Sequence, residues 1–240
     1  MLKIDLHLHT VASGHAHSTV FEYIQQAKKL KMKVIGLSDH GPGSSEALGS
    51  EVYFRSLKRI PKIVDGIRVL KGIEANIINA QGEIDISADT VARLDYVMAN
   101  FHAKTGYESQ GEKKNTAAMI KAIQSGRLNI ISHPFLNRVF SYDLKKVCEA
   151  ACESNVLLEL NLSGLAKSRN EDYILPNVKI MLDAVWRFKK KVLIGSDAHN
   201  IWELGDDSFL RPLKKKLGLS ETMIINNYPK ELFGVLGIKE

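Results

Sequence analysis

Four histidines lie close together near the start of the chain, at positions 7, 9, 15 and 17 of the segment DLHLHTVASGHAHS. In an extended segment alternate side chains share a face, so His7 and His9 point in the same direction. The segment SDAH gives Asp197 and His199 the same spacing. Imidazole and carboxylate groups in such pairs are suited to zinc, with manganese or iron as competitors. The two pairs are the first indication of a metal site.

The chain alternates between patterns typical of strands and of helices. Runs rich in Val, Ile and Leu predict seven strands, at 2–6, 33–38, 67–73, 95–101, 129–132, 156–161 and 191–196. Amphipathic patterns predict helices at 19–31, 51–65, 114–125, 143–154 and 176–190, and residues 228–236 are read as a closing helix. This alternation predicts a parallel α/β fold. Periodicity does not decide between a closed barrel and an open sheet.

Six of the seven predicted strands have a His, Asp or Glu within a few residues of their C-terminal ends. These residues are His7, His9, His40, Glu74, His102, His133, Asp197 and His199. Because parallel strands end on the same side, these side chains should converge, as they do at the active face of barrels. A single histidine after a strand is usually a loop residue, but the joint pattern favours a metal site. The exception is the strand at 156–161, which ends at Asn161 and carries Glu159 inside it.

Composition narrows the setting of this site. The 240 residues carry a formal charge of +6, partly in lysine runs at 189–191 and 214–216, which are read as solvated helix ends. Cys148 and Cys152 follow a helical core pattern and predict reduced thiols, as is usual in the cytoplasm. No segment is long and apolar enough for a membrane span, and the N-terminus lacks the pattern of a signal peptide. We expect one cytoplasmic domain over residues 1–240.

Six segments, in this order, resemble the PHP (polymerase and histidinol phosphatase) family: DLHLHTVASGHAHST, SDHGP, GIEANI, NFH, SHP and GSDAH. More narrowly, they resemble its stand-alone bacterial YcdX-like members, which bind three metal ions, rather than the histidinol phosphatases. The resemblance covers residues 5–199. It implies a distorted TIM-like barrel of seven β/α units, with the metal site at the C-terminal ends of the strands.

The resemblance also implies which residues bind each ion. The first ion would take His7, His9, Glu74 and Asp197, the second Glu74 as a bridge with His102 and His133, and the third His15, His40 and His199. Three zinc ions are expected, with manganese or iron as alternatives in some sites. His17 has no role in this pattern. Asp5 and Asp39, each beside a proposed ligand, are expected to orient these ligands at most.

Three functions compete. The first is a metal-dependent phosphoesterase that hydrolyses a small phosphomonoester with a metal-activated water held by Glu74, His7, His9 and Asp197. The second is a PHP-type nuclease or DNA-end-processing phosphoesterase, which is disfavoured because the chain carries no polymerase segment. The third is a non-catalytic metal-binding module, which is disfavoured because sets of three protein ligands leave open coordination positions.

The sequence favours the first function, with a small phosphorylated molecule as the partner. Lys104, Arg138 and Arg169 are candidates to bind its phosphate, although each is more typical of an ordinary surface residue. A nucleic-acid partner is disfavoured but left open, and so is a homo-oligomer. No membrane partner is expected.

Overall fold

A computed structural model describes residues 1–238, so the last two residues of the predicted domain 1–240 lie outside it. Its strands are β1 (Ile4–Asp5), β2 (Val34–Leu37), β3 (Ile63–Val64), β4 (Ile67–Lys71), β5 (Glu74–Asn76), β6 (Met98–Asn100), β7 (Ile130–Ile131), β8 (Leu157–Asn161) and β9 (Leu193–Gly195). Its α-helices are α1 (Val20–Lys29), α2 (Glu51–Ser56), α3 (Ala88–Val91), α4 (Glu112–Gln124), α5 (Leu144–Glu153), α6 (Leu162–Ala166), α7 (Ile174–Arg187), α8 (Lys214–Leu217) and α9 (Pro229–Leu236). Short 3-10 turns cover Val11–Ser13, Leu57–Arg59, Lys167–Arg169, Arg211–Leu213, Glu221–Met223 and Ile225–Asn227.

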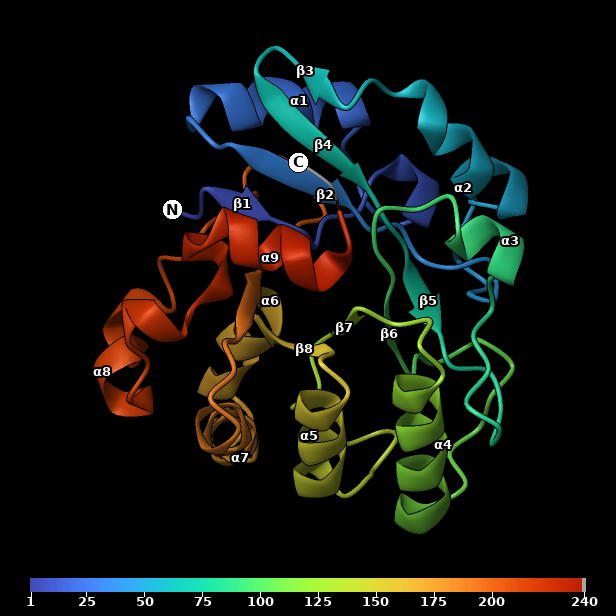
Figure 1. Cartoon of the computed structure of the whole chain (residues 1–240), viewed down its shortest axis with the longest axis vertical. Helices are drawn as coiled ribbons and strands as arrows, with labels where there is room; N and C mark the ends of the chain where they lie inside the picture. Colours follow the sequence, from blue (N-terminus) through green and yellow to red (C-terminus); the bar gives the residue numbers. More distant parts are fainter. Residues whose placement is uncertain (239–240) are drawn as a thin grey trace.

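The strands form two sheets whose neighbours are parallel, except for the antiparallel pair β3–β4. The first sheet has the order β1-β2-β4-β3 and the second the order β5-β6-β7-β8-β9. Isolated parallel bridges, Leu8 with Ala198 and His40 with Glu74, connect the two. The predicted parallel α/β fold is confirmed, and over residues 1–238 the strands form two sheets rather than one continuous closed sheet. Figure 1 shows both sheets and the helices around them.

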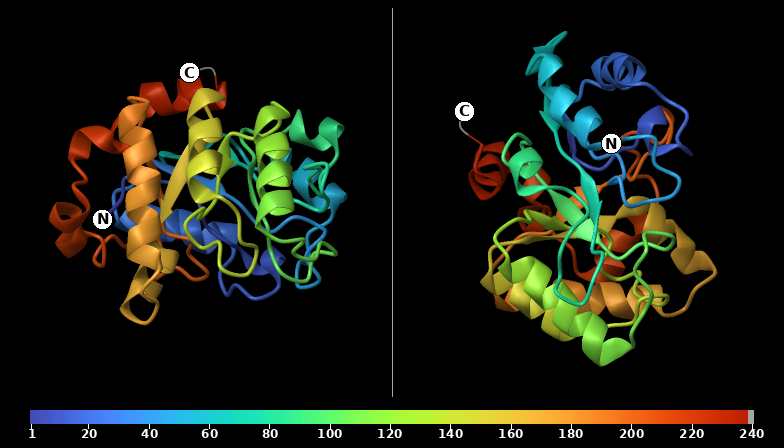
Figure 2. Two further views of the ribbon diagram at one scale, coloured as in Figure 1. Left: turned by 90° about the horizontal axis from the view of Figure 1, so that it is seen from below. Right: turned by 90° about the vertical axis from the view of Figure 1, so that its right-hand side faces the viewer.

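The helices cover the outer sides of the two sheets. In the second sheet's layer α5 packs against both α4 and α7, and the three lie side by side in Figure 1. The helix α1 packs against β2 and β4 of the first sheet. Figure 2 shows these two helical layers on opposite sides of the molecule, with the strands between them. This arrangement leaves the C-terminal ends of the strands to the loops that carry the candidate ligands.

Two predicted elements differ from the structure. The strand expected at 67–73 is divided into β4 and β5, because β4 hydrogen-bonds to β2 whereas β5 hydrogen-bonds to β6. The helix expected at 51–65 ends with the turn Leu57–Arg59, two residues before Pro61. Proline has no N–H to continue a helix and disfavours the helical conformation of the residue before it. The chain then forms β3, an edge strand that the sequence pattern did not indicate.

The remaining helices agree with their sequence signals. Thr19 and Glu22 form the expected capping box at the start of α1. The helix α7 begins two residues before Pro176, which therefore lies in its first turn as expected. Cys148 and Cys152 are free and buried, as their position in the helical pattern predicts. Within residues 1–238 no helix is both long enough and apolar enough to cross a membrane.

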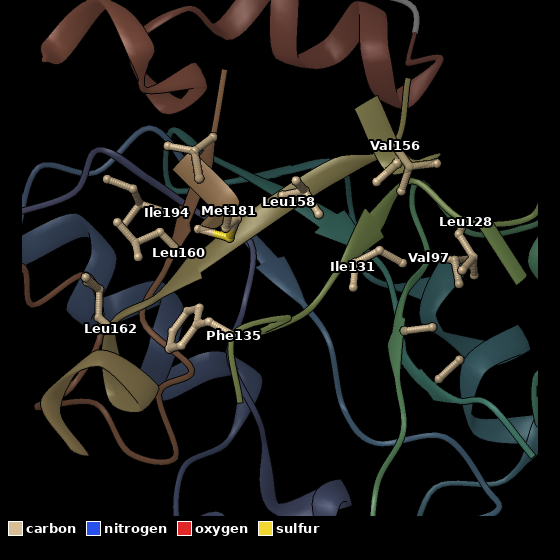
Figure 3. Close-up of a cluster of buried hydrophobic side chains, with 14 of the residues drawn as sticks. Val97, Leu128, Ile131, Phe135, Val156, Leu158, Leu160, Leu162, Met181 and Ile194 are labelled. Carbon is tan, nitrogen blue, oxygen red and sulfur yellow. The ribbon is translucent and has the colours of Figure 1, made fainter. Parts of the chain in front are cut away.

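The core has an outer and an inner part. Figure 3 shows a piece of the outer part, where Leu158 and Leu160 of β8 lie beside Met181 of α7. The inner part contains one buried residue from each of seven parallel strands: Ile4, Val34, Leu70, Met98, Ile130, Leu157 and Leu193. Leu232, Phe233 and Leu236 of α9 belong to the same cluster. This apolar layer lies between the strands, as in the filled interior of a barrel.

Tyr96 fills the space next to this layer and requires a glycine beside it. Its hydroxyl donates hydrogen bonds to the carbonyls of Leu6 (2.6 Å) and Leu37 (3.0 Å). A Cβ at Gly72 would lie 2.3 Å from the Tyr96 ring, far inside van der Waals contact. The ring is buried and cannot move without breaking both hydrogen bonds. Gly72 therefore lets the chain pass Tyr96 at the break between β4 and β5.

We predict that Gly72→Ala lowers the free energy of unfolding by about 3 kcal/mol, since overpacking a closed core typically costs about 1–3 kcal/mol. The control is Gly234→Ala in α9, where an added Cβ meets nothing within 4 Å. This control should be neutral or stabilising by up to about 1 kcal/mol, because alanine favours a helix. Urea unfolding of both variants measures the difference. Equal stability of the two variants would contradict the packing described here.

Candidate metal centre

All nine residues predicted as ligands lie in one cluster at the C-terminal ends of the strands. Three groups have their ligand atoms within 4.8 Å of one another: His9, His40 and His199; His7, His9 and Asp197; and His40, Glu74 and His102. The remaining two residues reach the same cluster. Nε2 of His15 lies 2.9 Å from Nε2 of His199, and Nε2 of His133 lies 2.8 Å from Oε1 of Glu74. Such a concentration of imidazole and carboxylate groups can hold metal ions.

Glu74 lies at the centre of the cluster and is 1% exposed. Its Oε2 lies 3.5 Å from Nε2 of His7, 3.5 Å from Nε2 of His9 and 3.1 Å from Nδ1 of His40. Its Oε1 lies 2.8 Å from Nε2 of His133 and 3.3 Å from Nε2 of His102. Burial would raise the pKa of Glu74, but His7 and His102 outweigh it and hold that pKa well below the usual value. Each oxygen of this charged carboxylate thus faces a different set of imidazoles.

Hydrogen bonds from Nδ1, the ring nitrogen that points away from the cluster, fix the tautomers of three histidines. Nδ1 of His7 lies 2.7 Å from Oε1 of Glu159, and Nδ1 of His102 lies 2.7 Å from Oδ1 of Asn76. Nδ1 of His199 lies 2.9 Å from the carbonyl oxygen of Asp197. Each partner oxygen accepts a hydrogen bond from the Nδ1–H group, so the lone pair of a neutral ring remains on Nε2. In metal-binding histidines one ring nitrogen binds the metal and the other donates a hydrogen bond to an oxygen. The rings described here have the same arrangement.

The spacing of the free nitrogens also fits metal ions. The Nε2 atoms lie in facing pairs, His7 with His9 at 3.1 Å, His102 with His133 at 3.4 Å and His15 with His199 at 2.9 Å. Two nitrogens bound about 2.0–2.1 Å from a tetrahedral zinc are themselves about 3.3 Å apart. Nδ1 of His40 is buried without a hydrogen-bond partner and points at Glu74. The donor set is therefore suited to zinc on both spacing and chemistry.

The electrostatics favour cations in this space. Burial lowers the pKa of His9 to about 3, although a hydrogen bond to the Asp197 carboxylate opposes this, so the ring is neutral as a ligand must be. Burial disfavours a charged His7, yet the carboxylates of Glu159 and Glu74 raise its pKa well above the usual value. The carboxylates thus attract positive charge to Nε2 of His7. A metal ion would compete with the proton for that position.

Glu159 is the first of two buried acids at the site to which the sequence analysis assigned no role. It is fully buried on β8, the strand without a terminal ligand, and Oε1 binds His7 as described. Oε2 accepts hydrogen bonds from the backbone N–H of His133 (2.9 Å) and from Nδ2 of Asn161 (3.1 Å). Room for this carboxylate comes from Gly195, where a Cβ would lie 2.1 Å from Oε1. The available signal was an acid inside the apolar strand LLELN.

A second buried acid, Asp85, positions His102 indirectly. Asp85 accepts hydrogen bonds from Nδ2 of Asn76 (2.5 Å) and from the backbone N–H of Gly43 (2.7 Å). Asn76 is held by these contacts so that its oxygen faces Nδ1 of His102. The same carboxylate also ties the turn after His40 to β5. Sequence analysis did not single out Asp85, because it follows no predicted strand.

Asp39 and Asp5 lie behind ligands, as was expected of them. Asp39 accepts a hydrogen bond from the Ser13 hydroxyl at 2.7 Å, and that hydroxyl lies 3.0 Å from Nδ1 of His9. Asp39 therefore acts on His9 through Ser13. Asp5 accepts from the backbone N–H groups of His7 (3.3 Å), Ser196 (3.1 Å) and Gly205 (3.0 Å). Asp5 fixes the backbone on both sides of the cluster.

The backbone is strained at two of the candidate ligands. His133 and Asp197 have φ values of 33° and 59°, a region that favours glycine. Such conformations cost about 1–3 kcal/mol each and persist where the surroundings impose them. The N–H of His133 is held by Glu159, and the N–H of Asp197 donates to the carbonyl of His7 at 2.9 Å. These contacts turn both side chains toward the cluster.

The three basic residues proposed to bind phosphate are engaged elsewhere. Lys104 forms an ion pair of 2.6 Å with Glu46, whose other oxygen lies 3.5 Å from Nδ1 of His15. The guanidinium of Arg138 lies 5.9 Å from the centre of the Tyr173 ring. The guanidinium of Arg169 likewise lies over the Phe209 ring, 4.7 Å from its centre.

His17 is the histidine outside the cluster. Its side chain is exposed, and its backbone N–H donates to the carbonyl of His199 at 2.8 Å. The position supports the loop that carries His15 without adding a ring nitrogen to the centre. This agrees with the absence of a role for His17 in the sequence pattern.

With the geometry established, comparison with known proteins identifies the family. Residues 5–161 match the PHP domain. The chain belongs to the PHP domain family. It is also 39% identical over 238 residues to a probable phosphatase of Proteus mirabilis, covering 98% of this chain and 94% of that protein. The likeness extends over nearly the full length of both proteins.

Solved structures share the fold. Histidinol phosphate phosphatase of Lactococcus lactis, solved with zinc, L-histidinol and phosphate, aligns with a TM-score of 0.62 at 16% identity, over 90% of this chain and 94% of that one. A putative histidinol phosphatase of Listeria monocytogenes aligns with a TM-score of 0.59 at 16% identity, over 88% of this chain and 99% of that one. At this identity the likeness establishes the fold, which is the α/β arrangement of PHP enzymes.

We predict that Glu159→Gln lowers zinc affinity about 10–100-fold, the usual effect of losing a partner behind a metal-binding histidine. Glu159 accepts from both His7 and the N–H of His133, and a glutamine offers a single acceptor oxygen for the two. Competition with a chromogenic chelator measures the affinity. Glu149→Gln, which removes a carboxylate paired with Arg187, is the control and should bind zinc normally. Normal zinc binding by Glu159→Gln in a folded protein would contradict the role given to Glu159.

Proposed function

We propose that the protein is a metal-dependent phosphoesterase that hydrolyses a small phosphomonoester at a trinuclear metal centre. The observation that carries this proposal is the buried carboxylate of Glu74, which is shared by imidazoles on both of its oxygens. A carboxylate shared in this way suits adjacent cations, the arrangement used in two-metal phosphatases. The full-length likeness to a probable phosphatase supports the same reaction.

Nine residues would hold the ions in three sets. The first set is His7, His9, Glu74 and Asp197, the second is Glu74, His102 and His133, and the third is His15, His40 and His199. Zinc fits the donor types best, with manganese or iron as alternatives in some sites. Bound zinc would lower the pKa of a coordinated water toward neutrality and offset the negative charge of the phosphate. We further propose that the parallel strands, with β4 and β5 counted as one, form the distorted barrel of seven β/α units that carries these sets.

The chain's own residues prepare this chemistry. Glu159 and Asn76 keep protons on Nδ1 of His7 and His102, so both rings present Nε2 as ligand atoms. Asp5 holds the backbone of His7, while Glu159 holds its ring. A cavity of about 290 Å³ adjoins Glu74 and the exposed side of the cluster, which gives a phosphate ester access.

A purely structural metal site is a weaker explanation. Structural zinc ions are usually enclosed by four protein ligands. Here the side chains of His199, His102 and Asp197 are 28%, 18% and 18% exposed, on the side where the cavity lies. Access of solvent to the donors favours catalysis over structural support.

We predict that His7→Ala lowers kcat/KM for a generic aryl phosphate at least about 100-fold, because loss of a ligand removes several kcal/mol of charge stabilisation. The measurement is phosphate release by zinc-loaded protein. His17→Ala is the matched control and should retain full activity, since this exposed histidine lies outside the cluster. The proposed function would be refuted if the native protein released no phosphate from any member of a panel of aryl and sugar phosphates. Equal rates for His7→Ala and the native protein would also refute it.

A further inference from the structure

The cavity beside the candidate metal centre has an unusual lining for a phosphatase site. Its residues are His40, Glu74, His102, His133, Asp197 and His199 on the side of the centre, and Phe101, Ala103, Leu136, Val139, Phe140 and Lys167 elsewhere. Apart from the candidate ligands and one lysine, every lining residue is therefore apolar. Among residues 1–238, no Ser, Thr, Asn or Gln lines it.

We propose that this cavity selects phosphomonoesters of apolar, ring-sized alcohols, and that Lys167 binds their phosphate. The inference rests on the proposed function and names the substrate class of the same site. Sugar hydroxyls placed in this cavity would lose their hydrogen bonds to water and find no side-chain partner, which costs about 1–3 kcal/mol per buried group. An apolar ring instead gains free energy by leaving water.

The apolar wall is rigid enough to discriminate between substrates. The rings of Phe101 and Phe140 are stacked, with centres 5.4 Å apart and planes within 17°. The loop that carries Leu136, Val139 and Phe140 is closed on itself, because the Tyr142 hydroxyl donates to the carbonyl of Pro134 at 2.7 Å. A surface held in this way is ready for a flat or ring-shaped group before the substrate arrives.

The size of the cavity is compatible with a small substrate. Its volume of about 290 Å³ is close to the lower end of small-molecule sites, which span roughly 300–1,000 Å³. This space suits a phosphate with one ring.

Among the described residues, Lys167 is the one lysine or arginine that lines the cavity. It begins the turn Lys167–Arg169 directly after α6, and its side chain is exposed. Within residues 1–238 its ammonium forms no ion pair or hydrogen bond, in contrast to Lys104, which is paired with Glu46. An ammonium with three free donors, next to donors for metal ions, matches the charge of a phosphate dianion.

The first experiment measures binding of inorganic phosphate to the zinc-loaded full chain by calorimetry. Lys167→Ala should raise the Kd for phosphate about ten-fold, and Lys167→Arg should restore most of the affinity. Lys179→Ala, which removes an exposed lysine on α7, is the control and should bind phosphate like the native protein. An unchanged Kd in Lys167→Ala would overturn the phosphate-binding role of Lys167.

The second experiment compares 2-phenylethyl phosphate with glycerol 1-phosphate, both esters of primary alcohols, so the leaving groups are similar in reactivity. The native protein should prefer the phenylethyl ester at least ten-fold in kcat/KM. Val139→Asp should reduce this preference at least ten-fold, because Val139 is 71% exposed at the cavity and tolerates a charge without unfolding. Ile63→Asp, at an equally exposed site on β3, should keep the preference.

The outcomes separate the two proposals. Hydrolysis of both esters with equal or reversed preference overturns the apolar substrate class and leaves the phosphoesterase function standing. Hydrolysis of neither ester, nor of any other phosphate ester, overturns the proposed function and the substrate class together. In that case weakened phosphate binding by Lys167→Ala would still support the phosphate site at Lys167.

Discussion

The structure depends on a buried carboxylate that is surrounded by imidazoles. Glu74 is removed from water, and removing a charge from water costs several kcal/mol unless opposite charge compensates it. Five histidines approach its two oxygens, and positive charge on this side, either a proton on His7 or a metal ion, compensates the carboxylate. Cations bound between the rings and the carboxylate, as proposed above, would satisfy both at once. The arrangement of the other ligands and of the residues behind them follows from this requirement.

The fold surrounds Glu74 with imidazoles by means of short strands and an apolar layer beneath the cluster. Strands of two to five residues bring the ligands to one end of the molecule, and the layer of one apolar residue per strand closes the space beneath them. Glycines admit the two large polar side chains of the interior, Tyr96 at Gly72 and Glu159 at Gly195. Glu159 then connects a ligand after β1 with a ligand after β7, which are 126 residues apart in sequence (133 − 7). The centre is thus supported from within the strands as well as from the loops.

Much of this arrangement could be predicted from the sequence, because parallel strands that end in His, Asp or Glu must gather those residues on one side. The pattern predicted the parallel α/β fold and the convergence of residues such as His7 and Glu74. It could not predict Glu159 as a partner of His7, since that contact depends on which strands are neighbours. It also could not show that Lys104 is paired with Glu46 while Lys167 lines the cavity, because loop conformation decides both. The break between β4 and β5 was missed for a similar reason, since it arises from the change of partner strand.

The central claim is that the nine converging residues bind a cluster of metal ions. The most direct test is a crystal structure of zinc-loaded protein with anomalous data on both sides of the zinc absorption edge, together with elemental analysis of the same sample. We expect three anomalous peaks, each about 2.0–2.2 Å from the donors of one assigned set, with Glu74 bridging two of them. A single peak, or peaks away from Glu74, would contradict the account.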